Sequence, residues 1–126
     1  MKSLLTLTAL IEVAIGLSLI AIPSVTASLL LGASLIEPSG ILVARIGGAA
    51  LISLAIACWL SKDEGNSSLV IAKALVFYNT AAALLLVYGV MIEKFSGLGL
   101  WPAAMLHVIL LIWCIKSIWS YSSTRV

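Results

Sequence analysis

The stretch ILVARIGGAALISLAIACWL, residues 41–60, decides the fold of this chain. Its only charged residue is Arg45. Its length matches the ~20 residues that a helix needs to cross about 30 Å of hydrocarbon. Polar and apolar residues do not alternate strictly along it, so a strand of a membrane barrel is not expected. The stretch therefore predicts a transmembrane helix.

Three similar stretches, at about 4–22, 69–91 and 100–119, fill most of the remaining sequence. Of the 126 residues, 63% are hydrophobic and 10% are charged, and the mean hydropathy is +1.24. Such a composition is typical of a protein embedded in lipid. We predict that residues 1–126 form a single domain, an all-α integral membrane four-helix bundle with short connecting loops.

The segment after the first span is predicted to be a separate short helix. Pro23 ends the span, because its ring clashes with the preceding turn, and it can also open a new helix. We interpret residues 24–31 as a helix that lies in the outer membrane interface and ends at Gly32. One kinked span reaching Leu31 is the alternative.

The N-terminal region also resembles a cleavable signal peptide. Met1-Lys2 precedes an apolar run, and Val25-Thr26-Ala27 offers a small-residue cleavage site. Glu12 in the middle of the apolar run argues against cleavage, which would leave three spans.

Basic residues indicate the orientation, because loops rich in Lys and Arg stay in the cytoplasm. Five of them fall on one side, and Arg45 and Lys94 fall on the other. The five are Lys2, Lys62, Lys73, Lys116 and Arg125. We therefore predict a multi-pass protein of the cell (plasma or inner) membrane, with both termini and the 61–68 loop in the cytoplasm. Cys58 and Cys114 would lie near that side, where thiols stay reduced, as small apolar fillers.

Each predicted span carries one polar or ionisable residue well inside it. These residues are Glu12, Arg45, Asn79 and His107. Small residues stand close to each of them, and small residues let membrane helices pack closely. They include Gly16, Gly48, Ala82–Ala83 and Ala103–Ala104. Because charges inside a membrane are expensive, such positions are candidates for function. We predict that the four form one buried polar network, to which Tyr78 could add its hydroxyl.

Each member of this network also has a structural interpretation. Glu12 could pair with Arg45 or His107 simply to hold the helices in register, or it could have a proton- or ligand-linked role. Arg45 could instead extend to the outer interface. Asn79 is interpreted as an interhelical hydrogen-bond residue. His107 could be a core histidine, a proton carrier or a haem ligand.

Several strings carry a resemblance to a known family. They are RIGGAAL at 45–51, FYNT at 77–80 and LWPA at 100–103, followed by His107 and Trp113-Cys114. Together with the Pro23-led segment that ends in Gly32, they resemble small four-span bacterial membrane proteins of the wider DoxX-like class. The resemblance covers most of the chain and implies the four-span fold and a membrane location. Some DoxX-like proteins are associated with quinone-linked oxidation of sulfur compounds, but this chain has no motif that carries that activity.

The leading functional hypothesis is a non-enzymatic membrane protein. Its polar network would organise the helices and bind a small ligand or a membrane partner, in the lipid bilayer, with a partner subunit or as a homo-oligomer. The sequence has no metal-spacing pair of His or Cys, no phosphate-binding loop and no nucleophile–base arrangement. The net charge of +2 reflects topology. We therefore expect no enzyme activity, no resident cofactor or metal, and no nucleic-acid partner.

Two alternatives remain open. One is a quinone- or haem-linked redox subunit, in which His107 and Tyr78 face the cofactor and Cys114 lies seven residues from His107 on the same helix face. The other is a proton-coupled carrier, acting as an oligomer, in which Glu12 and His107 exchange a proton during transport.

Overall fold

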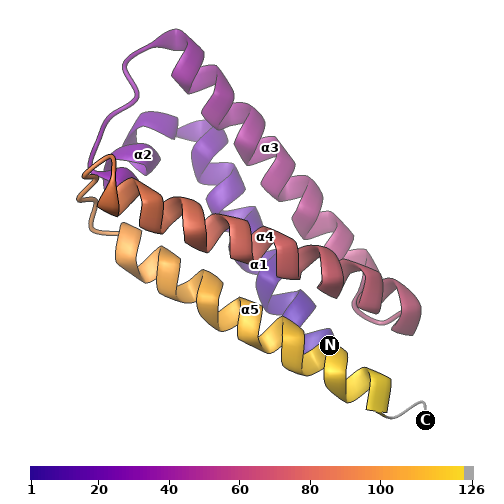
Figure 1. The fold of residues 1–126 in the computed structure, drawn as a ribbon. Helices are drawn as coiled ribbons and strands as arrows, with labels where there is room; N and C mark the ends of the chain where they lie inside the picture. The colour runs from indigo at the N-terminus through magenta and orange to yellow at the C-terminus, as the bar shows by residue number, and fades with distance from the viewer. Residues whose placement is uncertain (124–126) are drawn as a thin grey trace.

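Five helices and no strand make up residues 1–123, the part of the chain that the computed structural model describes. Four of these helices are long and apolar enough to cross a membrane, and α2 (Pro23–Leu31) is short (Figure 1). The four are α1 (Lys2–Ala21), α3 (Pro38–Ser61), α4 (Gly65–Met91) and α5 (Leu100–Ser123). Their ends lie within four residues of the predicted bounds. The prediction of an all-α protein with four spans is confirmed.

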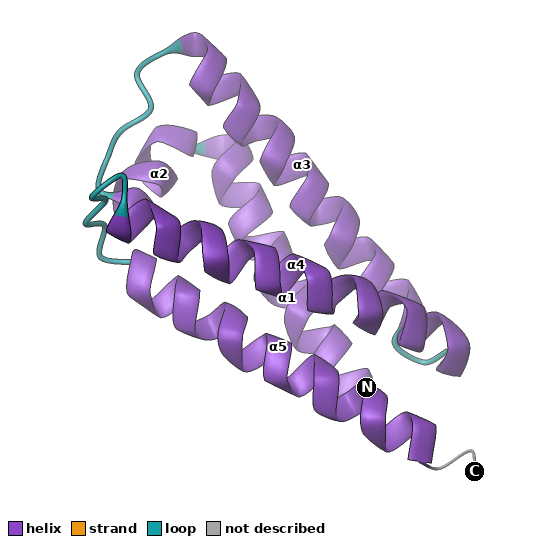
Figure 2. Ribbon diagram, viewed as in Figure 1, coloured by secondary structure: helices purple, strands orange, loops and turns teal. Residues whose placement is uncertain are grey.

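Helix α1 ends at Ala21 and a separate helix, α2, begins at Pro23, as the sequence predicts. Ile22 leaves the helical region with φ −134° and ψ 55°, and Pro23 opens α2, where its missing N–H is not needed. Gly32 ends α2 with φ 77°, a left-handed conformation that glycine adopts without strain. The alternative of one kinked span reaching Leu31 is therefore wrong. Figure 2 shows in teal the loops that join these helices.

The long helices are arranged as two pairs. α1 packs mainly against α3, and α4 packs mainly against α5, whereas contacts between the pairs are fewer. The pairs lie close together at the end that carries the N terminus and the α3–α4 loop, which we call the terminal end (Figure 1). Toward the opposite end, α3 diverges from α4 and α5 (Figure 1). There α2 contacts α1, α3 and α5, and we call this the α2 end.

Two glycines bring α1 and α3 into backbone contact. A Cβ atom added to Gly16 would lie 2.7 Å from the carbonyl oxygen of Gly48, and one added to Gly48 would lie 2.6 Å from that of Gly16. No larger residue fits at either position without separating the helices. Gly47 is different, because an added Cβ there would meet no atom within 4 Å. The prediction that small residues mediate close helix packing is confirmed for this pair.

A closed apolar core lies toward the terminal end. Buried side chains of all four long helices meet there: Leu4, Leu5, Ala9, Ala55, Cys58, Leu75, Leu110 and Cys114. Both cysteines are buried and free. Their side chains fill space in the core, as the sequence predicts.

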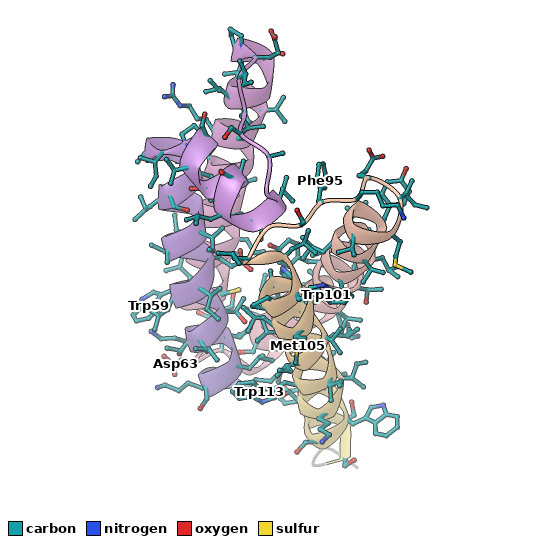
Figure 3. The ribbon with its side chains drawn as sticks, turned by 90° about the vertical axis from the view of Figure 1, so that its left-hand side faces the viewer. Trp59, Asp63, Phe95, Trp101, Met105 and Trp113 are labelled. Atoms are coloured by element: carbon teal, nitrogen blue, oxygen red, sulfur yellow. The ribbon has the colours of Figure 1, made fainter. Side chains whose placement is uncertain are left out.

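The exterior of the long helices is apolar. Only 17 to 33% of the most hydrophobic window of each is buried. Phe77 is 77% exposed, and Trp59 and Met105, both labelled in Figure 3, are also exposed. Water-soluble proteins rarely expose apolar surface on this scale, whereas lipid tolerates it. The chain is a multi-pass membrane protein.

Different contacts join the segments at the two ends of the bundle. At the terminal end, Lys2 Nζ lies 2.7 Å from Asp63 Oδ1 in an exposed ion pair, and this hydrogen bond holds the pKa of the Asp63 carboxyl below its usual value. At the α2 end, Ser96 N–H donates to the Leu31 carbonyl at 3.2 Å, and Gly99 N–H donates to that of Leu29 at 2.9 Å. The loop between α4 and α5 thereby satisfies carbonyls that the end of α2 leaves unpaired.

Candidate functional site

Four of the five predicted site residues meet between the two helix pairs. They are Glu12 of α1, Tyr78 and Asn79 of α4, and His107 of α5. The two α4 residues are neighbours in sequence, so the ~100° turn per helical residue sends their side chains to different partners. The Tyr78 hydroxyl forms a hydrogen bond with Glu12 of α1, and the Asn79 amide oxygen forms one with His107 of α5.

Asn79 fixes the orientation of His107. The Asn79 Nδ2 group donates to the Leu75 carbonyl oxygen at 2.8 Å, and this contact identifies the amide nitrogen because a carbonyl can only accept. Asn79 Oδ1 then lies 2.9 Å from His107 Nδ1. Since Oδ1 can only accept, Nδ1 must carry a hydrogen. In the neutral imidazole, His107 Nε2 is therefore a bare acceptor.

Tyr78 connects Glu12 to His107. Its hydroxyl donates a hydrogen bond of 3.2 Å to Glu12 Oε2. Its ring meets the His107 ring edge-on, with centroids 5.5 Å apart and planes at 82°. The aromatic pair thus joins α4 to α5 beside the hydrogen bond to α1.

Glu12 is buried, with 3% of its surface exposed. Among residues 1–123, only the Tyr78 hydroxyl donates a hydrogen bond to the Glu12 carboxyl group. The one salt bridge within residues 1–123 is between Lys2 and Asp63 at the surface, so it does not involve Glu12. The predicted pairing of Glu12 with Arg45 or His107 is therefore not what the structure has, and Tyr78 takes that place.

Arg45 lies outside the cluster, so the prediction of a network with one member from each long helix is wrong for α3. Its side chain is exposed, and it forms no salt bridge within the described residues. It lies in the first third of α3 (Pro38–Ser61), and the beginning of this helix diverges from α4 and α5 (Figure 1). A long, exposed side chain there fits the alternative interpretation, in which Arg45 extends toward the membrane interface.

A cavity of about 330 Å³ lies beside the cluster. Its polar lining consists of Glu12, Tyr78 and His107, whereas Asn79 stands behind His107 and does not line it. All five helices contribute apolar lining side chains, among them Ile15, Leu30, Leu51, Leu86 and Leu106. The arrangement is an apolar chamber with polar groups gathered at one place on its wall.

We did not predict this cavity from the sequence, although pairs of small residues near two of the polar residues pointed to it. Ala82–Ala83 and Ala103–Ala104 stand near Asn79 and His107, and both pairs were interpreted as packing residues. Only Ala83 and Ala104 are buried, whereas Ala82 and Ala103 line the cavity. Small side chains on α4 and α5 thus leave space as well as permit contact.

Thr8 is a buried polar residue that the sequence did not single out. It is fully buried on α1, one turn before Glu12, and its hydroxyl has no hydrogen-bond partner within residues 1–123. Hydroxyl residues are common in apolar spans, so nothing in the sequence distinguished it. The same part of the chain contains no group of three or more His, Cys, Asp or Glu side chains that could hold a metal ion.

Comparison with known proteins gives no match for this chain, whether with protein families, curated sequences or solved structures. The resemblance to the DoxX-like class stays a prediction from the strings that carry it. The fold and the site define a multi-pass membrane protein with a small, mainly apolar cavity between two helix pairs.

Proposed function

We propose that this protein is a non-enzymatic membrane protein that binds a small lipophilic ligand between its two helix pairs. The observation that carries the proposal is the apolar cavity with Glu12, Tyr78 and His107 on one part of its wall. Ligand sites in proteins are commonly apolar chambers with a few polar groups that orient the ligand. The volume of about 330 Å³ lies at the small end of such sites.

The ligand would enter from the lipid. Two of the lining residues, Ile15 and Leu85, are 43% and 68% exposed on the apolar exterior. The cavity therefore reaches the surface that faces hydrocarbon. A molecule dissolved in the bilayer could enter without crossing water.

The polar residues would divide their roles. Asn79 is buried, with both ends of its amide hydrogen-bonded, and supports the α4–α5 contact. Glu12 and Tyr78 line the cavity and would meet the ligand. This division combines the two predicted roles of the network, helix organisation and ligand binding.

The test is to fill the cavity. Ala82→Phe and Ala103→Phe add a ring to its wall, and Ala50→Phe adds one to an exposed site on α3 as the matched control. Each protein is placed in lipid nanodiscs, and saturable binding of phenylbutanol is measured against empty nanodiscs. Organic extracts of the purified proteins are analysed by mass spectrometry for a co-purifying lipophile.

We expect saturable binding by the parent and by Ala50→Phe, and its loss in the two cavity variants. A co-purifying lipophile should follow the same pattern. Binding that never exceeds partition into empty nanodiscs, or that is equal in all four proteins, would contradict the proposal.

A quinone-linked redox subunit is the second candidate. One observation favours it: His107 and Tyr78 both line the cavity, and their rings are in contact. Cys114, which the redox hypothesis also used, is buried in the apolar core and does not line the cavity. An absorption spectrum of the protein purified in mild detergent tests this candidate. A near-stoichiometric quinone or Soret band would favour it, and a spectrum of aromatic residues alone would count against it.

We also propose that the protein lies in the plasma or inner membrane with both termini in the cytoplasm. The support is the distribution of basic residues, four of which, Lys2, Lys62, Lys73 and Lys116, belong to the described chain. Arg125 lies outside the described residues. The Lys2–Asp63 contact supports a common side for the N terminus and the α3–α4 loop. A green fluorescent protein fused to the C terminus should fluoresce, and a dark fusion with active fused periplasmic phosphatase would reverse the orientation.

A further inference from the structure

Two residues that line the cavity, His107 and Glu12, each have a hydrogen-bond acceptor atom that receives no donor within residues 1–123. One is His107 Nε2, which is bare because Nδ1 carries the hydrogen that binds Asn79. The other is Oε1 of the ionised Glu12 carboxylate, because the hydroxyl of Tyr78 donates to Oε2 and no further hydrogen bond reaches this group within residues 1–123. A ligand that complements this wall must therefore bring donors.

No positive group of the described chain accompanies the Glu12 carboxyl. Arg45 is exposed, and the salt bridge of residues 1–123 is at the terminal end. An acidic ligand would be repelled by the carboxylate. A ligand that offers only carbonyl oxygens would face two acceptors, and would have to draw the Tyr78 hydrogen away from Glu12.

We propose that the cavity binds a lipophilic amine as its ammonium ion, with N–H groups donating to the Glu12 carboxylate and to His107 Nε2. The proposal rests on the ligand-binding function proposed above and specifies the ligand's chemistry. The Tyr78 ring, also on the cavity wall, supplies an aromatic face for the cation. The apolar remainder of the ligand lies among Ile15, Leu86 and Leu106.

The protons balance whether the ligand arrives as a neutral amine or as an ammonium ion. A neutral amine arriving from the lipid takes the proton of a neutral Glu12 carboxyl group. An ammonium ion arriving at a carboxylate needs no transfer. Both routes end in the same ion pair, whose charges are hydrogen-bonded to each other as burial in lipid requires.

The experiment compares four ligands that share one apolar body. They are phenylbutylamine, its trimethylammonium analogue, phenylbutanol and phenylbutanoate. Their affinities for the parent protein are measured in nanodiscs, with partition into empty nanodiscs subtracted. We expect the amine to bind about tenfold or more tighter than the alcohol. The trimethylammonium ion has charge but no N–H, so it should fall between them, and the carboxylate should bind least.

Variants then identify the partner of the ammonium group. Glu12→Gln should lower the affinity for the amine about tenfold or more and leave that for the alcohol within about twofold, because it removes the charge and keeps the shape. Glu12→Asp should retain part of the preference for the amine. Glu37→Gln removes an exposed carboxylate outside the cavity and should change neither affinity.

The outcomes separate the two proposals. Equal affinity for amine and alcohol in the parent protein would overturn the ammonium site while leaving a ligand cavity, and this comparison needs no variant to fold. A Glu12→Gln protein that folds and keeps the preference for the amine would overturn it as well. If none of the four ligands binds saturably, the ligand-binding function itself falls.

Discussion

The contact that joins the two helices of one pair differs in kind from the contact that joins the helices of the other pair. α1 and α3 meet backbone to backbone at Gly16 and Gly48, which have no side chains of their own. α4 and α5 are joined by side chains, through the hydrogen bond between Asn79 and His107. The first kind of contact depends on the absence of a side chain, and the second on a particular chemical group. The glycine pair therefore governs whether the bundle forms, whereas the polar pair governs what the cavity wall presents.

The largest expected effect comes from a side chain at the glycine contact. Gly48→Val places a Cβ against the Gly16 carbonyl, only 2.6 Å away before any movement, so α1 and α3 must separate. We expect a loss of about 3 kcal/mol or more in the free energy of unfolding. The measurement is unfolding by SDS in mixed micelles, followed by circular dichroism.

Gly47→Val is the matched control for this variant. It makes the same change of residue one position away, where an added Cβ meets nothing within 4 Å. It should unfold close to the parent protein. Equal destabilisation by the two substitutions would mean that helix propensity, and not the α1–α3 contact, sets the stability.

The next effect concerns the core that joins the two pairs. Leu75 is fully buried in it, and Leu75→Ala leaves a space that the neighbouring side chains fill only partly. We expect a loss of about 2 kcal/mol in the same unfolding assay. Leu84→Ala truncates a leucine that is 66% exposed, where lipid replaces the lost contacts, and should change little. A loss as large for Leu84→Ala would show that its face of α4 is covered by protein.

How far the sequence predicted this molecule can be judged from these same residues. The four spans followed from hydropathy, because a helix must bury about 20 apolar residues to cross the bilayer. Pro23 and Gly32 marked the ends of α2 for reasons of local backbone chemistry. Gly16 and Gly48 were expected to permit close packing, and they do.

The rotation and pairing of the helices could not be predicted in the same way. Span length leaves rotation about the helix axis undetermined, since neighbouring helices set it. Arg45 therefore was assigned to the network although it faces outward, and Glu12 was given charged partners although Tyr78 reaches it. The cavity depends on where α2 lies after the turn at Ile22, which no periodicity in one span encodes.

A smaller effect is expected at the polar contact. Asn79→Leu removes the amide that binds His107 and leaves Nδ1 without its acceptor. Interhelical hydrogen bonds in membranes contribute about 1 kcal/mol, so we expect a loss of that order. Thr80→Val is the control, because the Thr80 hydroxyl donates only to the Val76 carbonyl of its own helix, at 2.7 Å. Equal losses would remove the distinction between a bond within α4 and one between α4 and α5.

The last prediction does not depend on a stability measurement and tests the chemistry of the cavity wall directly. The sequence has one histidine, so the ¹⁵N spectrum of a histidine-labelled sample reports His107 alone. At a pH where the ring is neutral, the hydrogen should reside on Nδ1, held by Asn79 Oδ1, and Nε2 should give the signal of an unprotonated nitrogen. Asn79→Leu should release this preference and let the Nε2–H tautomer appear. If the spectrum of the parent protein instead places the hydrogen on Nε2, that atom is a hydrogen-bond donor. The cavity would then favour a ligand that accepts hydrogen bonds, which would favour a quinone over an amine.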